Sequence, residues 1–368
     1  MENKKCLIIG LIVLFLSGVC WASSSEQLKE FTLEGTHDFP IRTIRPLEIS
    51  NARGSVSIQG WSLDKIKVKV RKKIRAKTSE EALSLSKSIH FRTDLTSKAI
   101  EIATQYGKEL SIEERFKERV DPRVIMEMEI YAPSTLNLKV WSIAGRIHLK
   151  NWSSSIEIRS NSGAIEVENV KGERLSTLCE NCETVVQVAK SQDLRVISRD
   201  GGINLNQVQS KDIYVESDQG RIQLLRLKGS QLYVSKSGDI EGKGLQGKIE
   251  FHANSSRVTL SDVSGFLSGS LESGTLTAQV REWSFQDKAM IESRYGNIDL
   301  SLPARFSGEV DVWSVHGGTD LEFPLERSLD TFPVGPQPLN RLKGRIREGG
   351  ELLRVFSEKG NIRVRKSI

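Results

Sequence analysis

The chain has 368 residues, 53 of them basic and 47 acidic, and a formal net charge of +6 at pH 7. This length allows one large domain or two ordinary ones, and the mild basic excess does not by itself indicate a nucleic-acid or membrane partner. Aromatic residues make up only 6% of the chain and there are 5 histidines, which leaves few of the groups that catalytic and metal sites use.

Residues 1–22 have the features of a signal peptide. Lys4 and Lys5 precede an apolar run over residues 7–16, and small residues follow up to Ala22. The run is too short to span a bilayer, which needs roughly 20 apolar residues. We expect cleavage after Ala22, because Val19 stands where acylation of Cys20 in a lipoprotein would require Gly or Ala. No later segment is apolar enough to be transmembrane, so we expect an exported chain that is periplasmic, on the outer surface or secreted.

Residues 23–136 are predicted to hold a first solenoid rung and a helix-containing cap. Thr78-Ser-Glu-Glu81 resembles a capping box, and Ala82, Leu85 and Ile89 mark the apolar face of a short helix. Strands are predicted over residues 99–103 and 124–131.

A row of cations stands within this segment. Lys65, Lys67, Lys69 and Arg71 alternate with apolar residues, so they share one face of a strand. Such a row can bind anionic lipid headgroups or acidic glycans, whereas on an edge strand lysines more often only discourage aggregation.

Turn glycines recur through residues 137–323 and define the architecture. The intervals from Gly220 through Gly238 and Ser256 to Gly274 are all 18 residues. Apolar residues follow each turn at fixed offsets, in slots such as Ile147, Leu149 and Trp152 in one unit and Ile165, Val167 and Val170 in the next. A second strand then leads to the next turn, as in Ile156–Ile158, Ile213–Val215 and Leu232–Val234.

Such a unit cannot bury its apolar side alone, and stacking joins the inward slots into one core. We therefore predict an all-β protein, a single-chain β-solenoid or β-helix of about ten rungs of about 18–22 residues, with a small α/β insertion near the N-terminus. We take the coil as right-handed, although nothing in the sequence determines the hand. Trp61 and Trp152 fall in the inward third slot, whereas the position of Trp313 is undecided.

The pattern is interrupted once more before the C-terminus. Prolines at 324, 333, 336 and 338 predict a loop over residues 324–343, and residues 344–368 are predicted to form closing strands.

Two pairs of residues within the solenoid are candidate sites. Asp200 and Asp218 are predicted to occupy equivalent turn positions in adjacent rungs, where they could share a calcium ion; capping of their own turns is the favoured alternative. Cys179 and Cys182 are the cysteines left after leader removal, and a local disulfide at a turn is favoured over a redox pair or a zinc site.

The spacing Gly-x-Ile-x-Leu-x-x-Val, its repetition and the helix-bearing N-terminal segment resemble the bacterial putative-adhesin domain family, over roughly residues 45–366. The resemblance implies an exported β-solenoid and no particular activity, so no functional residue is carried over from it.

We expect a non-catalytic exported protein, an adhesin or a cell-envelope scaffold, that needs no cofactor. Its partner would be an envelope glycan, an anionic lipid or a surface protein, and no nucleic acid is expected. One alternative is a carbohydrate-active β-helix enzyme that acts on acidic polysaccharide, which clustered acids in a groove would favour. Another is a self-assembling envelope scaffold, which an uncovered terminal rung would favour.

Overall fold

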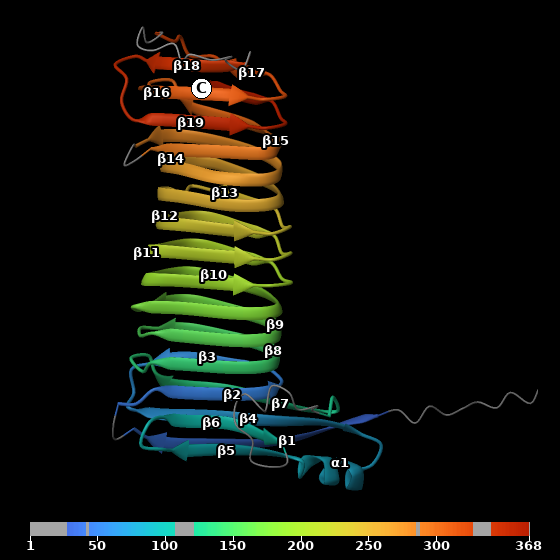
Figure 1. Ribbon diagram of the computed structural model, residues 1–368. Coiled ribbons are helices and arrows are strands. Elements are labelled where there is room, and N and C mark those ends of the chain that lie inside the picture. Colours follow the sequence, from blue (N-terminus) through green and yellow to red (C-terminus); the bar gives the residue numbers. More distant parts are fainter. Residues whose placement is uncertain (1–27, 42–43, 107–120, 285–287, 327–339, 368) are drawn as a thin grey trace, which may run out of the picture.

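The computed structural model describes residues 28–41, 44–106, 121–284, 288–326 and 340–367. Within them 20 strands form one sheet that winds into an upright stack, and the N-terminal and C-terminal strands lie at opposite ends (Figure 1). The predicted all-β solenoid with a small helix-bearing N-terminal part is confirmed. The predicted leader, with Cys20, and residues 327–339 of the predicted loop lie outside the described residues.

The elements follow in chain order. The N-terminal elements are β1 (Lys29–Pro40), β2 (Leu47–Arg53), β3 (Val56–Trp61), β4 (Lys65–Ala76), α1 (Ser79–Ser86), β5 (Ile89–Leu95), β6 (Ile100–Tyr106) and β7 (Val124–Pro133). The central strands are β8 (Leu138–Trp152), β9 (Ile156–Lys171), β10 (Arg174–Ser198), β11 (Ile203–Ser217), β12 (Ile222–Ser235), β13 (Ile240–Lys243) and β14 (Gln246–Trp283). The C-terminal strands are β15 (Ala289–Pro303), β16 (Gly308–Ser314), β17 (Thr319–Leu321), β18 (Arg341–Ile346), β19 (Leu352–Ser357) and β20 (Ile362–Ser367).

The central strands bend at corners, so a single strand contributes to two faces of the stack. We call face A the outward side of the segments that follow the corner glycines, such as 165–168, and face B the outward side of the segments that precede them, such as 156–159. Neighbouring rungs pair in parallel, and the inward slots align from rung to rung, as Ile147 does with Ile165. Both side chains are fully buried, because alternation places every second residue of a strand in the core.

A buried serine precedes most corner glycines by three residues, a feature that the glycine spacing alone did not reveal. Ser314 shows its role: Ser314 Oγ accepts a hydrogen bond from Gly317 N at 2.9 Å and donates one to Gly360 O of the next rung at 2.7 Å. The corner serines that are buried in this way are Ser142, Ser160, Ser198, Ser217, Ser235, Ser293, Ser314 and Ser357. The hydroxyls of Ser217, Ser235 and Ser357 likewise bond within the turn or to a neighbouring rung, whereas Ser142 Oγ and Ser293 Oγ have no hydrogen-bond partner among the described residues.

One rung departs from the predicted register. The pairing of β11 with β12 shifts between Gln209 and Asp212, and Tyr233 then pairs with Val215 rather than with Tyr214. A one-residue slip turns every side chain to the other side of the sheet. Tyr233 is therefore fully buried, whereas Leu232 and Val234, predicted as the repeat's apolar pair, lie half-buried on face B.

At both ends of the stack, segments that are far apart in the chain pair with one another. β2 and β3 lie between β8 on one side and β6 and β7 on the other. β19 and β20 lie between β15 and the pair formed by β16 and β17, so the C-terminal strands lie one rung inside the end. Outside these rungs the pairing becomes antiparallel, as in β4 with β7, β1 with β4, β5 with β6 and β18 with β16.

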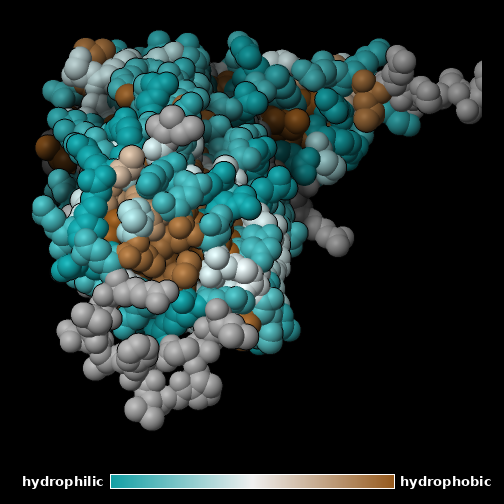
Figure 2. Space-filling view, turned by 90° about the horizontal axis from the view of Figure 1, so that it is seen from above, coloured by the Kyte–Doolittle hydropathy of each residue, from teal (hydrophilic) through white to brown (hydrophobic). Residues whose placement is uncertain are grey.

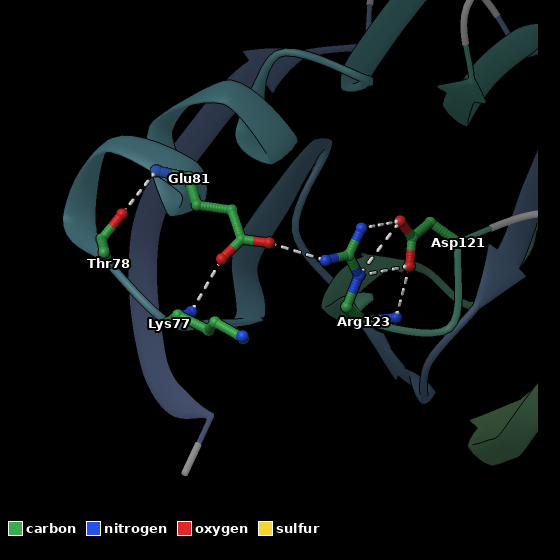
Figure 3. Close-up of polar contacts among 5 residues, drawn as sticks. All are labelled: Lys77, Thr78, Glu81, Asp121 and Arg123. Atoms are coloured by element: carbon green, nitrogen blue, oxygen red, sulfur yellow. Dashed lines mark hydrogen bonds and ion pairs between the residues drawn. The ribbon is translucent and has the colours of Figure 1, made fainter. Parts of the chain in front are cut away.

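Helix α1 starts at the N-terminal end as the capping box predicts. Thr78 Oγ1 accepts a hydrogen bond from Glu81 N at 3.2 Å, and Glu81 Oε2 accepts one from Lys77 N at 2.8 Å (Figure 3). Glu81 Oε1 also accepts a hydrogen bond from Arg123 at 2.7 Å, and Arg123 binds Asp121 (Figure 3). These contacts fasten the helix to the residues that precede β7.

The helix is shorter than the predicted apolar face. It ends at Ser86, and Ile89 begins β5, where it is fully buried. The predicted strands over 99–103 and 124–131 are confirmed as β6 and β7, apart from small differences at their ends.

Candidate functional site

The predicted basic row lies on the outward side of β4, between carboxylates of two other strands. Lys65 Nζ lies 3.9 Å from Asp38 Oδ2 of β1, and Lys69 Nζ donates to Glu129 Oε2 of β7 at 3.1 Å. The hydrogen bond to Glu129 raises the pKa of Lys69. These two cations are therefore paired in the folded chain.

The other two members of the row have acidic or aromatic neighbours. Arg71 Nε donates to Glu34 Oε1 at 2.7 Å, which raises the pKa of Arg71. Lys67 lies between Asp38 and Tyr131 in the strand register. A role of the row in binding an anionic partner stays a prediction, and three of its four cations already have a carboxylate partner.

Two aromatic side chains lie next to this row. The rings of Trp61 and Tyr131 are 5.5 Å apart, with Lys65 Nζ 5.8 Å from the Trp61 ring and Lys69 Nζ 5.4 Å from the Tyr131 ring. Trp61 is only half-buried, so its predicted place in the core is wrong. The prediction holds for Trp152, whose side chain is buried and donates from Nε1 to Leu136 O at 2.8 Å.

Trp313 lies on face B near the C-terminal end. Its ring is 4.8 Å from that of Phe356, and the guanidinium groups of Arg341 and Arg354 lie 5.2 and 5.7 Å from the Trp313 ring. Asp311, which is 2% exposed, accepts two hydrogen bonds from Arg341 at 2.7 Å each. The cluster joins β18 to β16, which is a structural role.

The predicted equivalence of Asp200 and Asp218 is wrong. Arg199 N bonds Cys179 O while Asp218 N bonds Ser198 O, so Arg199 and Asp218 are the equivalent residues and Asp200 is one position farther on. Asp218 instead lies 2.7 Å from Lys236 Nζ in the next rung. Alternating charges along this corner pair with one another, and the described residues hold no group of three or more His, Cys, Asp or Glu that could bind a metal ion.

Cys179 and Cys182 occupy the serine and glycine slots of one corner. They align with Ser160 and Gly163 of the preceding rung, are both buried, and form a disulfide with their Cα atoms 5.8 Å apart. This placement suits a staple at the turn, in line with the favoured alternative, and their oxidation state in solution stays a prediction.

Face A changes character along the stack, which sequence reasoning missed. At its N-terminal rungs charges pair between neighbours, as Arg146 with Glu166 at 3.5 Å and Lys150 with Glu168 at 2.7 Å. Over β11–β14 the columns of Glu166 and Glu168 carry mostly amides and hydroxyls, whereas the column of Arg146 keeps the charges of Arg221, Asp239 and Arg257. We call the following residues the neutral strip: Asn204, Asn206, Gln223, Thr259, Ser261 and Thr277. The change is visible in the sequence at the third and fifth positions after the corner residue, where Glu166 and Glu168 give way to Asn204 and Asn206.

A hollow of about 370 Å³ opens in the neutral strip. It lies at the short strand β13, where Gly242 stands in the inward column that Leu224 and Leu260 occupy in the adjacent rungs. Its wall includes Glu241 and Lys243, and Glu241 forms an ion pair with Arg221. A second hollow, of about 290 Å³, lies beside the basic row and is lined by charges of both signs.

The C-terminal end shows apolar surface at its centre within a polar rim (Figure 2). The last rungs contribute Leu321, Leu325 and Leu342, which are only partly buried. The self-assembling alternative would depend on this end. No helix in the described part of the chain has the length and apolar character needed to cross a membrane.

Comparisons with known proteins give a family match and distant structural likenesses. The family model described as Toastrack DUF4097 matches residues 173–365, just over half of the chain. No curated protein matches. The chain is similar to a putative adhesin from Bacteroides fragilis, with 13% identity over 73% of this chain and 97% of the other and a TM-score of 0.38. A putative adhesin from Parabacteroides merdae has 10% identity over 73% and 96% of the two chains and a TM-score of 0.43.

Proposed function

We propose that this chain, which belongs to the Toastrack DUF4097 family, is an exported, non-catalytic rod that binds a polymeric partner along its side, as an adhesin or a cell-envelope scaffold. The family match confirms the resemblance to the putative-adhesin domain family of unknown function. The leader-like residues 1–22 support export.

The observation that carries the proposal is the alignment of outward side chains into columns. Asn204 lies between Val185 and Gln223, and Glu241 lies between Gln223 and Thr259. Neighbouring strands are about 4.8 Å apart, so each column repeats a contact at that spacing along the rod. A polymer can use many such equivalent positions at once, whereas a small substrate needs a few groups that converge in a cleft.

The pairing of charges also favours binding over catalysis. General acid–base chemistry needs two groups that converge on a reacting atom. Here Glu168 pairs with Lys150, Asp218 with Lys236 and Glu272 with Arg294, each across adjacent rungs. These carboxylates serve the stack, and each has its charge compensated by a neighbour.

A binding screen on the mature chain, residues 23–368, tests the proposal. Immobilised protein would be exposed to neutral and acidic polysaccharides and to vesicles with anionic lipid, with and without calcium, and both bound polymer and released fragments would be measured. We expect saturable binding that strengthens with polymer length and releases no fragments. Fragment release would establish the enzyme instead, and filament formation without binding would establish the self-assembling scaffold.

The basic row gives the screen its first variant. If it binds an anionic partner, the Lys65→Glu, Lys67→Glu and Lys69→Glu triple variant should lose binding to acidic glycan or anionic vesicles. Because Lys65 and Lys69 are paired with Asp38 and Glu129, the variant also places like charges together, so its fold must be checked by circular dichroism.

A further inference from the structure

The columns of face A are charged near both ends of the stack and almost uncharged between them. Glu166 and Glu168 precede the neutral strip in the register, and Asp299 follows it. Within these columns from Val185 to Gln279 the charged residues are Glu241 and Lys243, which have opposite signs. Arg221, Asp239 and Arg257 flank these columns at the corner, and they are paired, Arg221 with Glu241 and Arg257 with Asp239. The strip itself therefore offers a charged partner little net attraction.

Amides and hydroxyls replace the charges there. Asn204, Gln223, Thr259 and Ser261 line the hollow and are partly exposed. Amide groups supply both donors and acceptors, and hydroxyls can act as either. Groups of this kind match the hydroxyls of an uncharged sugar, which also donate and accept.

Asn206 gives an independent sign of unmet hydrogen bonding in the strip. Its Oδ1 atom is buried and has no hydrogen-bond partner among the described residues. Asn206 aligns with Leu225 in the next rung, and Leu225 lines the hollow. An acceptor left without a donor is costly, so a ligand hydroxyl that reaches it after the amide rotates would gain more than from an exposed group.

Apolar side chains in the same columns complete the match. Val185 lies next to Asn204, and Leu225 lies between Asn206 and Lys243. The C–H faces of a sugar ring can pack on such flat aliphatic positions while its hydroxyls reach the amides. The rung spacing then repeats this mixed surface along the rod.

We propose that the neutral strip binds an uncharged, hydroxyl-rich polysaccharide lying along the rod, with the hollow at Gly242 as its deepest contact. This inference rests on the proposed binding function and names the partner class and the surface. The strip residues come from β11, β12 and β14, and the short β13 lies between β12 and β14 at this place.

The test uses the mature chain and a triple variant, Asn204→Ala, Gln223→Ala and Thr259→Ala. The probes are size-fractionated neutral glucan, mannan and galactan, with polygalacturonate as the acidic comparison. We expect the variant to bind the neutral polymer at least about tenfold more weakly, because three hydrogen-bonding side chains are lost. Binding by the unaltered chain should change little with salt, since no ion pairs form. Ser176→Ala with Ser270→Ala, both outward on face B, is the matched control and should bind normally.

The outcomes separate this inference from the proposed function. Neutral polysaccharide bound equally by the triple variant would overturn the strip while leaving the binding function intact. The strip would also be excluded as the binding surface if only acidic glycan or anionic vesicles bound and this binding were lost in the Lys65→Glu, Lys67→Glu and Lys69→Glu triple variant. Absence of binding to every probe would count against both proposals. A thermal melt of each variant ensures that a lost signal reflects the surface and not the fold.

Discussion

The N-terminal end of the stack and its central rungs are held together by different interactions. At the end, β1, β4 and β7 pair antiparallel, and their outward faces carry cross-strand ion pairs such as Lys73 with Glu127 at 2.8 Å. In the centre, parallel rungs repeat the Ser-x-x-Gly corner and the inward aliphatic columns. Charges on the outer strands discourage edge-to-edge association, where a bare edge would invite it.

This difference explains where a binding surface can form. The residues of the neutral strip over β11–β14 are uncharged and form no ion pairs, whereas Lys150 and Glu168 pair across the rungs before them. The end strands use their outward positions for ion pairs, which leaves fewer groups free for a partner. We therefore place the proposed ligand on the neutral strip, whose side chains are not used in ion pairs between rungs.

A glycine substitution should break the central rungs and leave the end intact. Gly163 has a φ of +117°, and a Cβ there would lie 2.1 Å from Gly145 O of the neighbouring rung. Gly163→Ala should therefore lower the free energy of unfolding by about 3 kcal/mol or more, as judged by urea denaturation.

Gly35 of β1 provides the matched control. A Cβ at Gly35 would have only His37 Nε2 within reach, at 3.5 Å. Gly35→Ala should be neutral or slightly stabilising, because alanine loses less backbone entropy than glycine on folding. Similar losses in the two variants would show that the corner is not the special feature of the central rungs.

The C-terminal end should depend on one buried ion pair. Asp311 is 2% exposed and bonded twice to Arg341, whose side chain is 28% exposed. Asp311→Ala should cost about 2–3 kcal/mol, less than for a wholly buried pair because water still reaches Arg341. Hydrogen exchange should show the loss in β18. Asp320→Ala, which removes an exposed carboxylate beside Arg363, should leave exchange unchanged; an equal effect would contradict a special role of Asp311.

The periodic part of the fold could be predicted from the sequence, because the apolar slots after Gly145 and Gly163 recur in most of the later rungs. The ends could not be predicted in the same way. The insertion of β19 and β20 beneath β16 depends on pairing between segments far apart in the chain, on which local spacing gives no information. Likewise, the shift that buries Tyr233 follows from one missing residue in a turn, which leaves the local pattern of alternation unchanged.

The candidate surfaces were predicted less completely for a related reason. Lys65 and Lys69 are visible as cations within one strand, but their partners Asp38 and Glu129 come from other strands. Alternating charged residues in the sequence show which side chains share one face of a strand, but they do not show which residues of the neighbouring strands lie beside that face. Asp200 and Asp218 failed because rungs of 19 residues place Arg199, rather than Asp200, in register with Asp218.

Acid should loosen the N-terminal end before the β11 rung. Hydrogen bonds from Tyr131 and Lys69 hold the pKa of Glu129 below its ordinary 4.5, and a hydrogen bond from Arg123 holds the pKa of Asp121 below 3.8. Since both folded pKa values are lowered, these pairs stabilise the fold above the ordinary values, and that contribution is lost as the pH falls through the lowered ones. Hydrogen exchange, corrected for intrinsic rates, should rise in β4 and β7 relative to β11 between about pH 6 and pH 3. Glu129→Gln should reduce this rise; β11 opening first would contradict the comparison.

The smallest expected effect lies at a single residue of the central rungs. Val188 has a φ of 53°, a left-handed conformation that is unfavourable for a β-branched side chain, whereas Asn151 and Asn169 hold the equivalent corner in preceding rungs. Asn169 Nδ2 donates to Asn151 Oδ1 at 2.6 Å, so an asparagine at 188 would relieve the backbone and extend this ladder. Val188 is 46% exposed, and little apolar burial is lost. Val188→Asn should therefore raise the free energy of unfolding by about 0.5–1 kcal/mol.

Val185→Asn, the same change at an extended outward position in β10, should bring no gain, since asparagine is a poorer strand former than valine. If Val188→Asn were destabilised as much as Val185→Asn, the left-handed backbone at Val188 would not be a source of strain.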